Sequence, residues 1–196
     1  NLQNMQALGR IPEWRKLNAY LMEAMPGDSG VVKSKKELDD RDRASIQHMS
    51  TFSKSDSDNT ALLNRLKGSR EQDYLTRVNS PWFYDTFRAY VDHSLRTADY
   101  TEGKIDDQRV GLGLEWESHR KAANILLSQS VDGGNDRFGV ELNWSQWLGD
   151  HLQYVLGFNS QADIPLQAIQ KGNEGKSYTV GLNLQKNESQ EAGAAY

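Results

Sequence analysis

Two carboxylates in this sequence have the spacing that places both side chains on the same face of a β-strand. Glu115 and Glu117 lie two residues apart in the stretch RVGLGLEWE, residues 109–117, and side chains two apart on a β-strand project to the same side. Paired carboxyl groups can catalyse glycoside hydrolysis, but they must then oppose each other across the sugar. Neighbouring carboxylates on one face also arise freely in polar pore linings. We therefore disfavour glycoside hydrolysis.

Other residue types that support catalysis are dispersed. The chain has no cysteine, and Gly111 and Gly113 precede no helix that could hold a phosphate. The net charge is -4 and the basic residues form no stripe, which disfavours nucleic-acid binding. The histidines are too scattered for a metal motif: His48, His93, His119 and His151. The sequence therefore indicates no enzyme, no metal and no cofactor.

The stretch around the two carboxylates alternates strictly between apolar and polar positions. One face carries Val110, Leu112, Leu114 and Trp116, and the other carries Arg109, Glu115 and Glu117. The same alternation recurs at residues 137–144, 151–158 and 178–185. A strand of this kind faces two different environments.

Period-two patterning extends over most of the chain after Ala44. It predicts strands at 46–54, 73–78, 87–95, 107–117, 121–130, 137–147, 151–160 and 176–186, with a further one beginning in 190–196. We expect a tight turn at 148–150 and long loops at 96–106 and 161–175. Short turns on one side and long loops on the other are typical of outer-membrane barrels, although a soluble antiparallel sheet can show them too.

Composition leaves both of those classes open. The chain has 196 residues, of which 37% are hydrophobic, and no apolar run approaches the roughly 20 residues that a membrane helix needs. Aromatic residues near strand ends or on the apolar parity fit either an interfacial girdle or the core of a sandwich: Trp82, Phe83, Tyr84, Trp116, Trp144, Trp147, Tyr154 and Phe158. Glycines and charges at the opposite parity favour a hydrated barrel interior.

Helical periodicity marks the first part of the chain. Trp14, Leu17, Leu21 and Met25 share one helical face, Pro12 suits a first helical turn, and residues 26–28 form a stop. An earlier helical stretch carries Leu2 and Met5, and a later helix should be capped by Asp28 or Ser29. This pattern fits a helical-hairpin repeat or a helical cap on the next domain. We place the helical domain at 1–43 and the strand domain at 44–196.

Several motifs, in order, resemble the family of PgaA export porins for poly-β-1,6-N-acetylglucosamine. RTADYTEGK at 96–104 with residues 109–117 is similar to the first barrel hairpin of that family, and LTRVNSP at 75–81 is similar to its strand ending in a Ser-Pro turn. DIPLQA at 163–168 resembles its DTPLRA loop, NES at 187–189 its NER segment, and Glu13, Trp14, Arg15 and Pro26 its last tetratricopeptide unit. The sequence departs from the family pattern at Ile164, Gln167 and Ser189.

The resemblance implies a mainly β fold: antiparallel outer-membrane β-barrel strands preceded by a short α-helical tetratricopeptide-like segment in the periplasm. It also implies a barrel of about twice as many strands as these, so we expect the sequence to be part of a longer precursor. The implied function is export of partly de-N-acetylated poly-β-1,6-N-acetylglucosamine across the Gram-negative outer membrane, supporting biofilm formation. The implied partners are this polymer, outer-membrane lipid, and a periplasmic deacetylase at the helical region.

A polymer with free amines is cationic, so we expect an acidic lumen to attract it. Lumen candidates come from the polar parity of the strands: the carboxylates Asp92, Glu115, Glu117 and Glu141, and the hydrogen-bonding residues Tyr90, Asn143, Gln153 and Asn183. Glu115 and Glu141 could instead pair with Arg88, Arg109 or Arg137 across strands. Two other functions stay open: a soluble carbohydrate-binding β-sandwich, and an unrelated outer-membrane channel or adhesin.

Overall fold

The protein consists of two helices followed by one antiparallel sheet. The computed structural model describes residues 10–54, 70–100, 103–132, 137–149, 151–161 and 166–184. The helices are α2 (Ile11–Ala24) and α3 (Ser29–Arg41), and a short helix α4 (Leu166–Gln170) precedes the last strand. The strands are β1 (Ser45–Lys54), β2 (Arg70–Asn79), β3 (Phe87–Tyr100), β4 (Gly103–Ser118), β5 (Lys121–Asp132), β6 (Phe138–Leu148), β7 (Leu152–Asn159) and β8 (Ser177–Leu184).

Each strand pairs only with its neighbours in sequence. The sheet order is β1-β2-β3-β4-β5-β6-β7-β8, every pair is antiparallel, and among the described strands β1 and β8 remain open edges. This confirms the predicted mainly β, antiparallel fold. Because all the described strands belong to one sheet, the alternative of a two-sheet sandwich is wrong.

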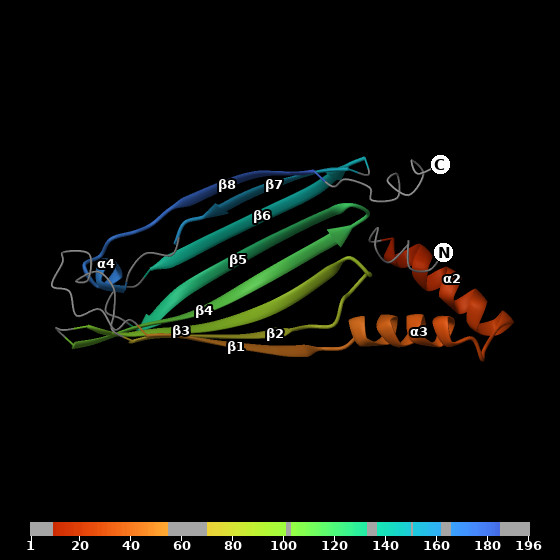
Figure 1. Ribbon diagram of the computed structural model, residues 1–196, viewed down its shortest axis with the longest axis horizontal. Helices are drawn as coiled ribbons and strands as arrows, with labels where there is room; N and C mark the ends of the chain where they lie inside the picture. The colour runs from red at the N-terminus through yellow and green to blue at the C-terminus, as the bar shows by residue number, and fades with distance from the viewer. Residues whose placement is uncertain are drawn as a thin grey trace, which may run out of the picture.

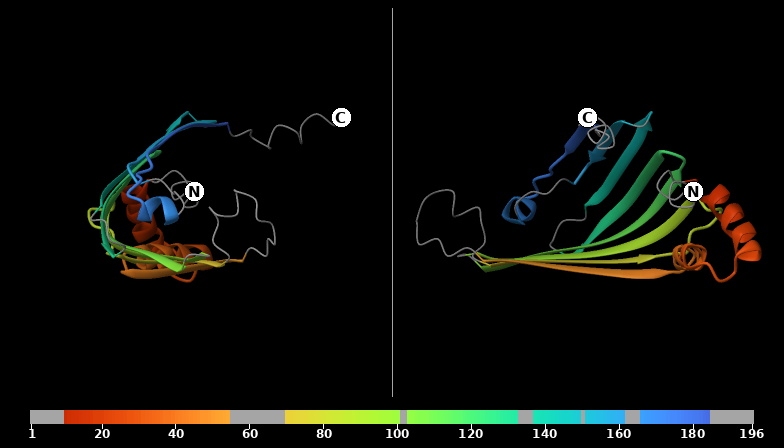
Figure 2. Two further views of the ribbon diagram at one scale, coloured as in Figure 1. Left: turned by 90° about the vertical axis from the view of Figure 1, so that its left-hand side faces the viewer. Right: turned by 45° about the vertical axis from the view of Figure 1, so that its right-hand side comes forward.

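The sheet bends into a trough with a helical element at each end. In Figure 1, α2 and α3 lie beyond one end of the strands, here called the helix end, and α4 lies at the opposite or far end. Figure 2 shows the curvature, with α4 on the concave side. At the helix end the β4–β5 and β6–β7 connections are tight turns through Arg120 and Gly149, both with positive φ.

The convex face is apolar. The register places one continuous row of aliphatic side chains across the first six strands: Ile46, Val78, Val91, Leu112, Leu127 and Val140. Most of them are exposed, for example Leu112 at 62% and Ile46 at 74%. Aliphatic side chains held outward in a band of this kind are the pattern of a lipid-facing surface.

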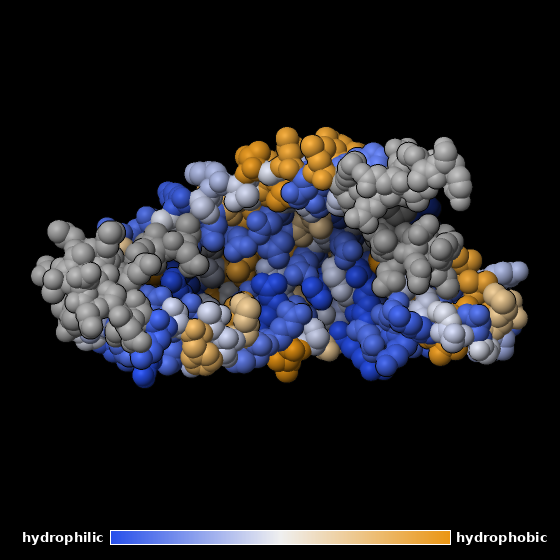
Figure 3. All heavy atoms as spheres, in the orientation of Figure 1, coloured by the Kyte–Doolittle hydropathy of each residue, from blue (hydrophilic) through white to orange (hydrophobic). Residues whose placement is uncertain are grey.

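The concave face is polar. Figure 3 looks into the trough, where hydrophilic colours cover most of the hollow and apolar residues gather along the edge formed by β7 and β8. The sequence-predicted alternation of the two faces is therefore present in the fold. Among the described residues, no helix is both long and apolar enough to cross a membrane.

The helical pair packs through a face that differs in part from the predicted one. Ile11, Trp14 and Asn18 are the buried positions of α2, and Trp14 Nε1 donates a hydrogen bond of 2.7 Å to Ser34 Oγ on α3. Met25, predicted on the packed face, is instead the exposed residue that ends α2. Asp28 caps α3 as predicted, since its carboxylate accepts from the Val31 amide at 3.0 Å.

The prediction of a loop at 96–106 is wrong. β3 and β4 continue as a hairpin until Tyr100 pairs with Gly103, so the polar run belongs to paired strands. This hairpin follows β1 and β2, and so it is not the first strand pair of the sheet. The predicted 161–175 loop contains α4. Residues 1–9 and 185–196, with the features expected there, and residues 163–165 of the DIPLQA motif, lie outside the described residues.

A tyrosine packs flat against a glycine at the centre of the concave face. Tyr90 on β3 pairs with Gly113 on β4 and is 2% exposed. A Cβ added to Gly113 would lie 2.1 Å from Cζ of Tyr90, inside van der Waals contact. Asn124 donates a hydrogen bond of 2.7 Å to the Tyr90 hydroxyl. Gly113 therefore provides the space that lets the ring lie on the sheet.

Gly113→Ala should lower the free energy of unfolding by about 1–3 kcal/mol, because the new methyl group displaces a ring that is packed on all sides. Urea titration of the full-length protein refolded into lipid vesicles would measure the loss. Gly181→Ala is the matched control, since its Cβ would meet nothing nearer than 3.7 Å. Equal stability of the two variants would contradict this role of Gly113.

Candidate functional site: the concave face

The eight residues singled out from the sequence lie on the concave face. The register fixes their orientation, because Glu115 pairs with Arg88, Tyr90 with Gly113, and Gln153 with Asn183. Their strands are β3 for Tyr90 and Asp92, β4 for Glu115 and Glu117, β6 for Glu141 and Asn143, β7 for Gln153 and β8 for Asn183. Their part in polymer passage stays a prediction.

An arginine joins β2, β3 and β4 in the middle of this face. Arg77 forms a bidentate ion pair with Asp92, with Nε to Oδ1 and Nη2 to Oδ2 both at 2.7 Å. Its Nη1 also lies 3.3 Å from Oε1 of Glu115. The guanidinium rests over the Tyr90 ring, 4.0 Å from the ring centroid. Asp92 is buried, with 9% of its side chain exposed. The negative charge of Asp92 is therefore neutralised by Arg77 and is largely hidden from solvent.

Glu115 has a second arginine partner. Arg88 donates to Glu115 Oε2 through Nη2 and also through Nε, the latter at 2.8 Å. This is one of the cross-strand pairs weighed from the sequence, and it is confirmed. The contact with Arg77 was missed, because residues 77 and 115 lie on strands that are not neighbours and their approach depends on the bend of the sheet.

Glu117 connects the sheet to the helices. Its Oε2 lies 3.1 Å from Nη2 of Arg41 on α3. The Arg41 guanidinium lies 3.9 Å from the ring centroid of Trp82, and that of Arg88 lies 4.8 Å from the same centroid. Trp82 therefore contacts two arginines at the mouth of the trough, which explains an aromatic residue there without assigning it to lipid.

A second arginine fixes the helices to the turn between β2 and β3. Arg15 donates two hydrogen bonds of 2.9 Å to Asp42, and its Nη2 lies 2.6 Å from Asp85. The hydrogen bonds to Asp42 and then Asp85 raise the pKa of the Arg15 guanidinium, so it stays charged. Tyr84 and Asp85 both have positive φ, a conformation uncommon in residues other than glycine. This unusual turn presents Asp85 to the helical pair.

Charged residues at the far end form a buried cluster. Arg137 Nη2 donates to Asp107 Oδ1 at 2.9 Å, and Arg109 Nε forms an ion pair with Asp107 Oδ2 at 2.9 Å. Asp107 is 1% exposed and Arg137 is 8% exposed. Arg109 and Arg137, weighed from the sequence as partners of Glu115 or Glu141, bind Asp107 instead. Sequence reasoning missed Asp107, although it shares a strand face with Arg109 two residues later.

Helix α4 covers the concave face beside this cluster. Leu166 and Ile169 are each 3% exposed and pack on Ala98, with Tyr100 and Ile105 around them. These are the apolar positions that the concave parity carries at the far end of β3 and β4. A short helix lying on them keeps apolar surface away from water and narrows the trough there (Figure 2).

Glu141 stands apart from the other three predicted carboxylates. Its Oε1 accepts a hydrogen bond of 2.7 Å from Nδ2 of Asn143. Among the residues that the structure describes, no arginine or lysine reaches Glu141 within ion-pair distance. Beyond it, Asn183 Nδ2 donates to Gln153 Oε1 at 3.1 Å across β7 and β8. This side of the trough is therefore polar and almost uncharged.

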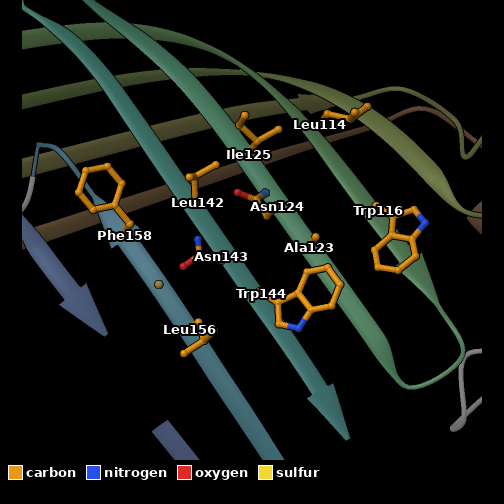
Figure 4. Close-up of a pocket in the computed structure, with 11 residues that line it drawn as sticks. Leu114, Trp116, Ala123, Asn124, Ile125, Leu142, Asn143, Trp144, Leu156 and Phe158 are labelled. Atoms are coloured by element: carbon orange, nitrogen blue, oxygen red, sulfur yellow. The ribbon is translucent and has the colours of Figure 1, made fainter. Parts of the chain in front are cut away.

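An apolar hollow lies on the other side of the sheet. It has a volume of about 460 Å³ on the convex face, and Trp116 and Trp144 bound it across Ala123 with ring centroids 5.7 Å apart (Figure 4). Trp144 Nε1 donates to the Tyr154 hydroxyl at 3.2 Å. Indoles with an apolar body and a polar edge suit a membrane interface. This hollow faces hydrocarbon and not the polar trough.

These features define a class of protein. A curved antiparallel meander with an apolar band outside, a polar trough inside and an aromatic cluster near one end is the wall of an outer-membrane β-barrel. No cluster of histidine, aspartate and glutamate side chains among the described residues could hold a metal ion.

Comparison with known families agrees with the class. Residues 46–196 match the family described as the PgaA membrane beta barrel domain, and the chain belongs to that family. This confirms the resemblance seen in the sequence motifs. No curated protein and no solved structure matches the chain. A transport barrel of this family places the chain in the outer membrane.

Spin labels should distinguish the two faces. The chain has no cysteine, so Leu127→Cys and Ser128→Cys introduce labels at neighbouring positions of β5 that face opposite sides. In lipid vesicles, dissolved oxygen should relax the label at 127 more strongly, and a water-soluble nickel chelate the label at 128. The accessibilities come from power-saturation electron paramagnetic resonance. The reverse order would contradict the assignment of the convex face to lipid.

Removing Arg77 should destabilise the sheet. Arg77→Met leaves the Asp92 carboxylate buried without its bidentate partner, which should lower the free energy of unfolding by about 3 kcal/mol. The double variant Arg77→Met, Asp92→Leu removes both charges and should recover most of this loss. Urea titration in vesicles measures both. A single variant as stable as the native protein would show that the pair is not structural.

Proposed function

We propose that this chain forms part of the wall of an outer-membrane porin that exports partly de-N-acetylated poly-β-1,6-N-acetylglucosamine and thereby supports biofilm formation. The observation that carries the proposal is the division of the sheet into an apolar convex face and a polar concave face, in a chain of the PgaA barrel family. A polar trough lets a hydrated polymer pass while the convex face stays in hydrocarbon.

Closure of the pore belongs to the same proposal. Among the described strands, the edges β1 and β8 have no further strand partner, and unpaired backbone groups could not face hydrocarbon. Further strands pairing with both edges would close the barrel, as the family resemblance implies. The trough described here would then be one side of the lumen.

The orientation of the barrel in the membrane follows from the helical pair. We place α2 and α3 in the periplasm, because they lie at the end of the sheet that carries the tight β4–β5 and β6–β7 turns (Figure 1), and short turns lie on the periplasmic side of outer-membrane barrels. A periplasmic deacetylase would bind the helical region. The charged face of α3 supports this, since Lys33 and Lys35 are exposed to solvent.

The structure refines how charge would act on the polymer. Carboxylates attract amines, but Asp92, Glu115 and Glu117 each have an arginine partner. A moving amine must compete with these arginines, so attraction by the paired carboxylates is weak. Weak attraction suits a passage that has to release the polymer as well as admit it.

Neutralising the predicted lumen carboxylates tests the proposal. Replacing Glu115, Glu117 and Glu141 together by glutamine in the full-length protein leaves Arg41 and Arg88 without anionic partners and makes the trough cationic. Secretion of the partly deacetylated polymer, measured in the culture supernatant by immunoassay, should fall about tenfold or more. Folded porin in the outer membrane should be quantified in parallel.

The control removes the same charge outside the trough. Glu13 and Glu23 are exposed on α2 and Asp106 lies on the convex side of β4, and their replacement by Gln, Gln and Asn should leave secretion near the native level. Undiminished secretion by the lumen variant, with normal amounts of folded porin, would reject an electrostatic contribution of the trough.

A further inference from the structure

The concave face has two unlike sides. The inward positions of β2, β3 and β4 are rich in charge: Glu71, Asp73, Arg77, Arg88, Asp92, Arg96, Asp107, Arg109, Glu115 and Glu117. We call this set of strands the charged wall. On the inward positions of β6, β7 and β8, called here the amide wall, Glu141 is the single charged residue.

The charged wall satisfies its own groups. Arg77 binds Asp92, Arg88 binds Glu115, and Asp107 lies between two arginines. Arg96 lies 3.4 Å from Asp73, and Glu71 also has an interaction partner. Buried ion pairs with several mutual contacts are costly to separate. A passing sugar would therefore gain little by displacing them, and this wall is best suited to hold the curvature of the sheet.

The amide wall offers polar groups that are not committed to ion pairs. Its register forms successive rows from the helix end toward the far end. Trp147, Gln153 and Asn183 make the first row, Asn143, Gly157 and Thr179 a later one, and Glu141, Asn159 and Ser177 the last. Asn143 and Asn183 are exposed. Gly157 lets the Asn143 and Thr179 side chains lie over the strand between them, since a Cβ there would be 3.1 Å from Asn143 Oδ1 and 3.2 Å from Thr179 Cβ.

This chemistry matches a sugar chain. An amide side chain both donates and accepts hydrogen bonds, and so does each sugar hydroxyl or N-acetyl group. The indole of Trp147 can pack against the apolar face of a pyranose ring. Glu141 adds one carboxylate that a free amine could bind without displacing an arginine.

On the basis of the proposed function, we infer that the amide wall is the carbohydrate track of the lumen. Trp147, Gln153 and Asn183 contact the polymer first, and Asn143 contacts it next. Glu141 is the subsite for a de-N-acetylated residue. The charged wall opposite does not bind sugar. The sugar backbone is thus recognised by the amide side chains and Trp147, and the free amine is recognised further along the same path by Glu141.

Single-channel recording in planar lipid bilayers can test this with the full-length protein. The probes are β-1,6-linked oligomers of N-acetylglucosamine, one fully acetylated and one partly deacetylated, and the readout is the dissociation constant for current block. Asn143→Leu with Asn183→Leu should raise this constant about tenfold for both probes, because hydrogen bonds to the sugar are lost. Glu141→Gln should raise it about fivefold for the deacetylated probe alone.

The control lies on the opposite wall. Arg96→Met with Asp73→Leu removes the Arg96–Asp73 ion pair of the charged wall and should leave both constants within about twofold of native. Native open-channel conductance and native electrophoretic mobility before heating show that each variant is folded. Asn143→Gln with Asn183→Gln keeps the amides and should restore binding.

The possible outcomes separate the inference from the proposed function. If the amide-wall variants bind both probes as tightly as the native protein, or if only the control loses binding, the track is not on the amide wall, and the porin proposal stands. If Glu141→Gln raised the dissociation constants of both probes equally, the assignment of Glu141 as the amine subsite would be overturned. If neither probe blocks the native channel, the proposed function itself fails.

Discussion

The alternation of side chains along hydrogen-bonded strands is the constraint on which this structure depends. A chain in hydrocarbon must pair every backbone N–H and C=O group, and a β-strand does so only through its neighbours. Each strand of the sheet then has one face in lipid and one in the trough. Because Leu112 and Leu127 occupy the convex row, charges such as Asp92 and Arg109 can only lie on the concave side. Confinement on that side forces these charges close together.

Close packing of charge explains why the trough is not simply acidic. Seen along the sequence, Asp92, Glu115 and Glu117 form an acidic set. In the sheet, Arg77 and Arg88 lie beside the first two and Arg41 reaches the third. The pair between Arg41 and Glu117 has a further consequence, because it joins the helical pair to the same network that shapes the sheet. Displacing α3 would therefore disturb a residue at the mouth of the trough.

The sequence was sufficient to predict what is local and insufficient for what depends on register. Strand positions, the two faces of each strand and the Asp28 cap follow from spacing within a few residues. The far half of the β3–β4 hairpin was mistaken for a loop, since Asp99 and Asp106 resemble turn residues until pairing is known. The contact of Arg77 with Glu115 and that of Arg137 with Asp107 could not be predicted, because each depends on how strands are aligned and how strongly the sheet bends.

Some apolar side chains lie on the concave face at the far end, against the general alternation of apolar and polar positions. Ala98 and Ile105 lie on the concave face, where apolar side chains should meet water. They do not, because Leu166 and Ile169 of α4 cover them. A polar trough with an apolar patch therefore requires a covering element, and the connection between β7 and β8 supplies it by folding inward (Figure 2). The position of α4 in the trough is thus a consequence of the strand pattern of β3 and β4, which precede it by more than 40 residues.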